Sequence, residues 1–279
     1  MPGPVLALAS SLAGGCGDFL GGTTARRIGV VRFTFCTQLI GLLIAVAWVV
    51  VSAAPVPPLR GLLAAAAAGV GLTVGIAAFF QAMVVGAISI VAPITATGVA
   101  VPIIAGVVRG ERPTAVQVAG ILAGIGGTVL AARPSSDLAP RIGESGIGLA
   151  CVGAVGGGLY LWLMSPASRY GVGWTMTVVC ATPVSLLAPV LIVRRASLRP
   201  ALSGRPVIAV VSAAILTFAA VTLYAFATRD GELAVVSVLA ALYPVVTVLL
   251  AFGVLGERLY GPQRLGVAVV LTGVLLLSA

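Results

Sequence analysis

The chain has 279 residues, of which 60% are hydrophobic and 8% are charged, and its mean hydropathy is +1.19. A soluble protein carries about 25% charged residues because its surface must be solvated, so this composition excludes a water-soluble fold. The formal net charge of +9 arises from 16 basic residues, all of them arginine. Without a basic face or an aromatic platform this charge does not indicate nucleic acid. It is typical of the cytoplasmic loops of a membrane protein.

Ten apolar stretches are long enough to cross a membrane, for which a helix needs about 20 residues. They lack the apolar–polar alternation of transmembrane β-strands. Short breaks separate them, and only residues 133–145 resemble a linker. We therefore predict an all-α integral membrane protein with transmembrane helices at 4–24, 29–52, 60–82, 87–108, 114–132, 146–165, 172–193, 206–228, 233–255 and 262–279.

The sequence offers little material for catalysis or for metal binding. It contains no His, and Cys16, Cys36, Cys151 and Cys180 lie in apolar stretches without the spacing of metal ligands. We expect four small buried side chains, with no metal and no cofactor. Enzymes that work within membranes need His, paired acids or an activated nucleophile, so we expect no enzymatic activity.

The second half of the chain repeats the first. Gly110-Glu111-Arg112 reappears as Gly256-Glu257-Arg258, and Gln, Gly, Gly and Leu follow each motif at the same spacing. A matched Glu-Arg pair with a matched Gln is hard to obtain by chance. Five helices is an odd number, so the second copy enters the membrane from the opposite side, as in many secondary transporters. We predict inverted five-helix repeats at 1–132 and 146–279, joined by a linker loop at 133–145.

Arginine placement supports this inversion. The loops after the odd-numbered predicted helices carry about 11 of the 16 arginines, which predicts that these loops are cytoplasmic and that both termini lie outside. A loop that is rich in arginine in one half also corresponds to a loop that is poor in arginine in the other half. Copies in opposite orientations are expected to differ in this way. One miscounted helix would reverse this absolute orientation.

Tyr243-Pro244-Val245-Val246-Thr247 leads into Leu255-Gly256-Glu257-Arg258 near the end of the second repeat. With its two five-helix halves, the chain resembles the drug/metabolite transporter superfamily, specifically its EamA-like branch. The likeness extends over essentially the whole chain in length, helix count and duplication. In the first half the motif is degraded, because Val99 and Arg109 replace the corresponding proline and leucine. The resemblance implies secondary transport of amino acids, metabolites or drugs without naming a substrate.

Asp18 is the most informative single residue. It lies about 14 residues into the first span, flanked by Gly17 and Gly21, and eight positions before the first arginine, Arg26. A carboxylate at this depth costs several kcal/mol unless it is paired, hydrated or protonated. Two interpretations remain open. In the functional interpretation, Asp18 couples transport to protons or binds a substrate amine. In the structural interpretation, its carboxylate reaches interfacial water or Arg26.

Glu111 and Glu257 mark equivalent helix ends in the two repeats. A carboxylate at the end of a helix opposes the helix dipole, and the next helix begins directly afterwards with Pro113 or Pro262 in its first turn. The carboxylate can accept hydrogen bonds from the free N–H groups of that next helix and pin the hairpin. We predict this structural role, with coupling or gating as the alternative.

Prolines interrupt the predicted fourth span at Pro93 and Pro102, the ninth at Pro244, and the seventh at Pro183 and Pro189. Proline frees a backbone carbonyl, and such breaks in transporters often line the cavity, although proline is also common in membrane helices. The matched breaks favour a substrate path beside the fourth and ninth helices. Candidate polar contacts are Thr95, Thr97 and Tyr243, and a candidate aromatic wall contains Tyr160, Trp162 and Tyr224.

Small and polar residues within the spans predict how the helices pack. Gln38, Gln81 and Gln117 are expected to form interhelical hydrogen bonds or to lie at an interface. Glycines spaced four apart let helices approach closely, and such pairs occur at Gly17-x3-Gly21, Gly71-x3-Gly75, Gly120-x3-Gly124 and Gly153-x3-Gly157.

These features favour a proton-coupled secondary transporter of small amino-acid-like molecules, metabolites or drugs that works by alternating access. The alternative is a channel or a scaffold, although no filter loop or charged ring is visible. The expected partners are a small-molecule substrate, membrane lipid and protons, without nucleic acid. Both a monomer and a homodimer remain open. The expected location is a bacterial inner (plasma) membrane, as a multi-pass protein.

Overall fold

The computed structural model describes residues 2–85, 94–95, 97–131, 144–198, 201, 204–243, 245–247, 249–250 and 261–278. Every regular element within these ranges is a helix, and none is a strand. The predicted all-α class is therefore confirmed for this part of the chain. Pro93, Pro244, Glu257 and most of the predicted linker 133–145 lie outside the described residues.

The described helices follow the predicted spans in chain order. The first half contains α1 (Pro2–Ile28), α2 (Val30–Ser52), α3 (Leu59–Val85), the 3₁₀ helix η1 (Thr97–Val99), α5 (Ala100–Val108) and α6 (Ala115–Ala131). The second half contains α7 (Glu144–Ser168), α8 (Val172–Val193), α10 (Arg205–Asp230), α11 (Leu233–Ala240) and α13 (Gly261–Ser278). Helix α8 runs without a break through Pro183 and Pro189, so the predicted interruption of the seventh span is wrong. A membrane helix tolerates proline because neighbouring helices can satisfy the backbone groups that the proline leaves without a hydrogen bond.

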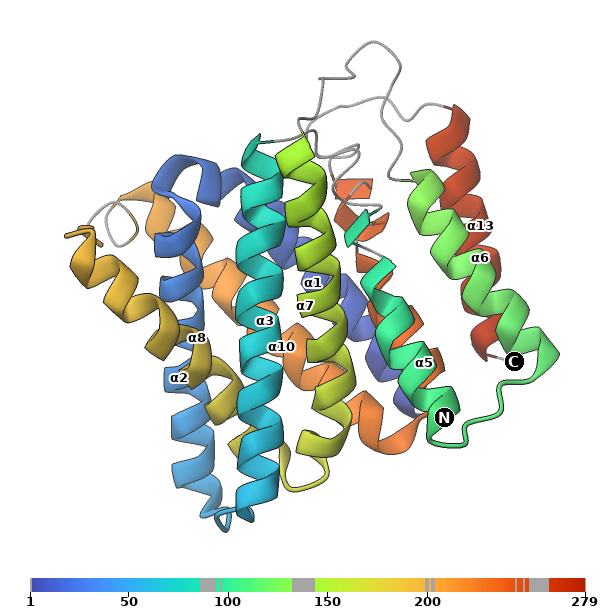
Figure 1. Cartoon of the computed structure of the whole chain (residues 1–279), viewed down its shortest axis with the longest axis horizontal. Coiled ribbons are helices and arrows are strands. Elements are labelled where there is room, and N and C mark those ends of the chain that lie inside the picture. Colours follow the sequence, from blue (N-terminus) through green and yellow to red (C-terminus); the bar gives the residue numbers. More distant parts are fainter. Residues whose placement is uncertain are drawn as a thin grey trace.

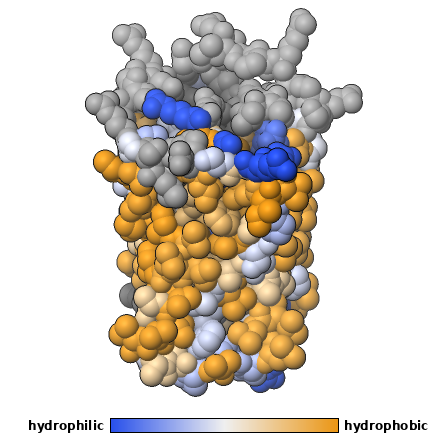
Figure 2. Space-filling model, turned by 90° about the vertical axis from the view of Figure 1, so that its left-hand side faces the viewer, coloured by the Kyte–Doolittle hydropathy of each residue, from blue (hydrophilic) through white to orange (hydrophobic). Residues whose placement is uncertain are grey.

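The outer surface of the bundle is apolar. Large aliphatic side chains such as Leu43, Leu122 and Ile208 are exposed, and Figure 2 shows apolar residues over the middle of one side, with hydrophilic residues toward its two ends. Such a surface suits lipid, and the chain is a multi-pass membrane protein. Within the described residues, six helices are long and apolar enough to cross a membrane, at Gly3–Ala25, Val30–Ser52, Leu59–Ala82, Gly146–Ser168, Val172–Val193 and Pro206–Asp230. Shorter apolar helices lie at Thr97–Val108, Ala115–Gly127, Leu233–Thr247 and Arg264–Gly273.

Each helix of one half pairs with a helix of the other half, in the pattern expected for two copies of one unit. Helix α1 packs along α10 and α3 packs along α7, so the first helix of each half lies beside the third helix of the other. The second helices, α2 and α8, contact each other, as do α5 with α11 and α6 with α13. In Figure 1, α6 ends at the top of the view whereas α13 ends in the lower half, where both chain termini lie. Equivalent helices of the two halves therefore run in opposite directions.

Glycine allows α3 and α7 to pack with their backbones in contact. A Cβ atom at Gly71 would lie 2.9 Å from the Gly156 oxygen and the Tyr160 nitrogen, and one at Gly75 would lie 2.8 Å from the Gly157 nitrogen. Real Cβ atoms do not approach backbone atoms so closely, and helix backbone cannot move aside as a side chain can. The predicted close packing through spaced glycines is confirmed at this interface.

The Gly75→Ala variant is expected to be destabilised by about 1–3 kcal/mol, because overpacking forces α3 away from α7. The change should appear as a lower apparent melting temperature of the detergent-solubilised protein. Gly148→Ala is the matched control, since a Cβ there meets no atom within 4 Å. Equal melting temperatures for the two variants would contradict the backbone contact.

The cysteines do not all follow the expectation of burial. Cys36 and Cys180 are buried and Cys16 is half-buried, whereas Cys151 is exposed. Cys151 shares the outer face of α7 with the exposed Val155, so the expectation is wrong for this residue. An apolar sequence context cannot distinguish a side chain in the bundle interior from one that faces lipid.

Candidate functional site

A cavity lies between the two halves of the bundle. It is bounded by α1, α3 and η1 from the first half and by α7, α10 and α11 from the second. It holds about 1050 Å³ when the open space at its mouth is counted, and its interior has room for a small organic molecule. The polar side chains that line it are Ser10, Asp18, Thr95, Tyr160, Thr217, Tyr224 and Tyr243.

The rest of the cavity wall is apolar or consists of glycine backbone. Leu72, Ile76 and Phe79 on α3 face it from one half, and Leu161 and Val221 face it from the other. Such a wall favours a ligand with a large apolar part. The few polar groups must then fix its orientation, as in most small-molecule sites.

Hydrogen bonds hold two of the polar side chains in place. The Ser10 hydroxyl donates to the Ala220 carbonyl at 2.7 Å, which joins α1 to α10. The Tyr224 hydroxyl donates to the Leu161 carbonyl at 2.8 Å. Because its only proton is used there, the buried Ser237 hydroxyl, also at 2.8 Å, is the donor to the Tyr224 oxygen. These bonds make the wall rigid.

Asp18 is the acidic group of the cavity. It lies about 24 Å along α1 from Pro2 and about 15 Å from Ile28 at 1.5 Å per residue, far from both ends of the helix. Its carboxyl group and the Tyr243 phenol line the same cavity. Among the described residues no basic group forms an ion pair with it; the side chain of Arg26 lies outside what the structure describes. The carboxyl group of Asp18 can therefore take up either a proton or a cationic group that enters the cavity.

The structure brings most of the predicted site residues together. Thr95, Tyr160, Tyr224 and Tyr243 line the same cavity as Asp18, although they lie in four different segments of the chain. The rings of Tyr160 and Tyr224 are 6.2 Å apart between their centres. The two tyrosines thus form one aromatic side of the cavity.

Two predicted contacts lie elsewhere. Thr97 is exposed, and its hydroxyl donates to the Ile94 carbonyl at 2.6 Å. Trp162 is not part of the cavity wall; the Arg109 guanidinium carbon lies 5.9 Å from the centre of its ring. The helical turn explains the second case, since Trp162 points about 160° away from Tyr160 around α7 at 100° per residue.

The fourth and ninth segments border the cavity where their helices are interrupted, but Pro102 does not form part of its wall. Gly98 and Val99 of η1 line it, as do Ala240 and Ala241 where α11 ends. Pro102 is fully buried within the continuous helix α5 and does not contact the cavity, so the prediction that it lines the path is wrong. The first two positions of α5 precede it, and a helix tolerates proline in its first turn.

Glu111 does not cap the helix that follows it. Its two carboxylate oxygens accept hydrogen bonds from the backbone N–H groups of Leu233 at 2.9 Å and Ala234 at 3.1 Å, at the start of α11 in the other half. The start of α6 is capped instead by Thr114 and Gln117, whose side chains each accept the other's N–H. The expected hairpin contact of Glu111 is therefore wrong. The free N–H groups of α11 attract the carboxylate because no side chain of its own caps that helix.

Sequence reasoning missed Ser10 and Thr217, although a signal was present. Ser10, Gly14 and Asp18 are spaced four apart and share one face of α1. On α10, Thr217, Val221 and Tyr224 follow the same helical period. Aligning small and polar residues at this spacing with Asp18 would have marked both faces.

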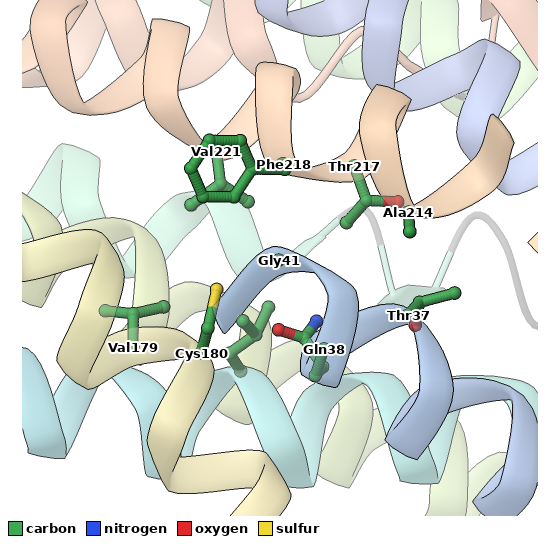
Figure 3. A pocket seen from close by; sticks show the side chains of 10 residues that line it. Thr37, Gln38, Gly41, Val179, Cys180, Ala214, Thr217, Phe218 and Val221 are labelled. Atoms are coloured by element: carbon green, nitrogen blue, oxygen red, sulfur yellow. The ribbon is translucent and has the colours of Figure 1, made fainter. Parts of the chain in front are cut away.

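The glutamines have three different environments. Gln117 belongs to the cap of α6, Gln81 is exposed on α3, and Gln38 is buried on α2. Gln38 lines a second, much smaller pocket between α2, α8 and α10, which has room for about one water molecule. Figure 3 shows the side chains that enter this pocket, with Gln38 and Cys180 on α2 and α8 and Thr217 on α10.

The geometry defines a multi-helix membrane protein with a small-molecule cavity between two repeated halves. The sequence matches the EamA-like transporter family over residues 1–133 and 144–279, and the chain belongs to this family. The family comprises membrane transporters of the drug/metabolite type. A solved structure titled "Crystal structure of protein" has a similar fold, with a TM-score of 0.83 and 18% sequence identity. The match covers 99% of this chain and 98% of that chain. No curated protein matches the sequence.

Proposed function

We propose that this protein is a secondary active transporter that exchanges small, largely apolar organic amines for protons. The observation that carries the proposal is Asp18, a carboxylate without a described basic partner in a largely apolar cavity shared by both repeats. An acid in the middle of a membrane helix is costly, and such residues mark substrate sites and proton paths. Amino-acid-like molecules, metabolites and drugs with an ammonium group all fit this chemistry.

Competition at one carboxylate supplies the coupling. Asp18 binds either a proton or the ammonium group of a substrate, because a protonated carboxylic acid no longer attracts a cation. If Asp18 takes up substrate on one side and a proton on the other, proton entry drives substrate out. The apolar wall then contributes affinity for the rest of the molecule through burial of its surface.

The two halves supply the alternating access. Ten transmembrane helices in two inverted repeats, 1–132 and 146–279, would place the cavity at the midplane, where it can open to either side. We propose that both termini face outside in a bacterial inner membrane.

The proposal is tested with purified protein in two steps. A thermal-shift screen against amino acids, neutral metabolites and organic amines at several pH values identifies ligands, and amines are expected to stabilise the protein more at higher pH. Proteoliposomes loaded with a stabilising amine should then release it faster when a pH gradient is imposed. Flux that follows only the gradient of the amine would instead indicate a channel, and no ligand response at all would contradict transport of amines.

A further inference from the structure

The side chain of Gln38 is buried, and its amide reaches the space of a small pocket without a described hydrogen-bond partner. The residue is 4% exposed, and no group within the described part of the chain forms a hydrogen bond with its side chain. Buried side-chain amides are almost always hydrogen-bonded to protein, water or ligand. The amide reaches into the pocket between α2, α8 and α10 (Figure 3), so its missing partner belongs to whatever fills that pocket.

This pocket lies directly beside the transport cavity. Leu72, Thr217 and Val221 line both spaces. Thr217 also lies against the backbone next to Asp18, because a Cβ atom at Gly17 would be 3.1 Å from the Thr217 Oγ1 atom. A molecule that pairs with Asp18 therefore has the Gln38 pocket within its immediate surroundings, with Thr217 between them.

Most of the pocket lining is apolar, and its few polar groups are uncharged. The Gln38 amide both donates and accepts, and the Thr217 hydroxyl can do either. The Thr37 hydroxyl is already used, since it donates to the Thr34 carbonyl at 3.0 Å. No charged residue lines the pocket among the described residues. A charged group would lose its hydration there without a counter-charge, whereas a hydroxyl would find matching partners.

We propose that the Gln38 pocket is a subsite of the transport cavity for a small, uncharged hydrogen-bonding group of the substrate, such as a hydroxyl. This inference rests on the proposed function. The preferred substrate then has three parts: an ammonium group at Asp18, an apolar body in the cavity, and a neutral polar group at Gln38.

Two probes that share an ammonium group and a phenyl ring test the subsite: phenethylamine and tyramine. Their binding to the detergent-solubilised full chain is measured by isothermal titration calorimetry. The wild type should bind tyramine, the polar probe, about three- to tenfold more tightly than phenethylamine, the range expected for one or two hydrogen bonds to a buried amide.

Gln38→Met keeps the length of the side chain and removes its amide, so the polar preference should fall to within about twofold while phenethylamine binds as before. Gly41→Ala tests the same space without removing a polar group, since its Cβ would lie 3.2 Å from the Cys180 sulfur and 3.4 Å from the Phe218 ring. It should also lower the preference. Gln81→Met is the matched control on an exposed position of α3 and should change nothing.

The outcomes separate the two proposals. Equal binding of both probes by the wild type, or an unchanged polar preference in Gln38→Met, overturns the subsite and shows a pocket that holds only water. Amine-driven proton flux in proteoliposomes would still support the proposed function in that case. Binding of neither probe by the wild type counts against both proposals.

Discussion

The Asp18→Asn variant is expected to lose proton-driven amine transport by about 100-fold or more. Removing one partner of a buried ion pair costs about 3–5 kcal/mol, which corresponds to at least that factor in affinity. The asparagine side chain can neither take up a proton nor neutralise an ammonium group in the cavity. Flux is measured in proteoliposomes with an imposed pH gradient and an amine identified by the thermal-shift screen.

Two further variants make this result specific. Asp230→Asn is the matched control, because the same substitution falls on an exposed residue at the end of α10. Its flux should equal that of the wild type. Asp18→Glu keeps the carboxylate and should retain part of the transport with a shifted pH dependence. If Asp18→Asn folds and still transports at the rate of the wild type, Asp18 has no part in the mechanism.

The Glu111→Ala variant is expected to weaken the contact between the two halves and to lower transport about five- to thirtyfold. The carboxylate joins the end of α5 to the first N–H groups of α11. Capping interactions of this kind contribute about 1–2 kcal/mol to a helix start. Because α11 ends at the cavity, its loosening changes the balance between the conformations that open to either side.

Hydrogen–deuterium exchange measures this contact directly. Peptides that contain Leu233 and Ala234 should exchange faster in Glu111→Ala, since the amide protons of these residues lose their acceptors. Glu232→Gln is the control, because this exposed residue precedes α11 and its side chain forms no cap. If exchange at the start of α11 rises equally in both variants, or in neither, the contact between halves does not hold α11.

The helical membrane class and the order of the helices could be predicted because they depend on composition and spacing, and the family was indicated by the resemblance of the repeat and its motifs. Apolar runs of a helix's length specify their own secondary structure in lipid, where every backbone group must bond within the segment. The repeated Gly-Glu-Arg motif indicated a duplication for the same reason, since it is a local pattern. Asp18 stood out because a single acid in an apolar span has a large desolvation cost wherever the helix packs.

Partners across the bundle could not be predicted in this way. Glu111 precedes α6 in sequence, and its contact with α11 over more than 100 positions depends on how the halves meet. Thr97 and Trp162 were also assigned to the cavity, but Thr97 is exposed and the turn of α7 directs Trp162 away from the cavity. Gln38 was expected to bond between helices, and only the packing of α2 against α8 and α10 shows that its amide faces a pocket.

The sequence by itself thus determined that this protein spans a membrane as a duplicated helical bundle with one acid inside it, because hydrophobicity, helix length and desolvation act on each segment alone. The tertiary structure decided which faces of the helices meet around Asp18. It also decided that Glu111 joins the two halves and that Gln38 lies beside the cavity. These facts depend on close packing between segments distant in sequence, which no local pattern records.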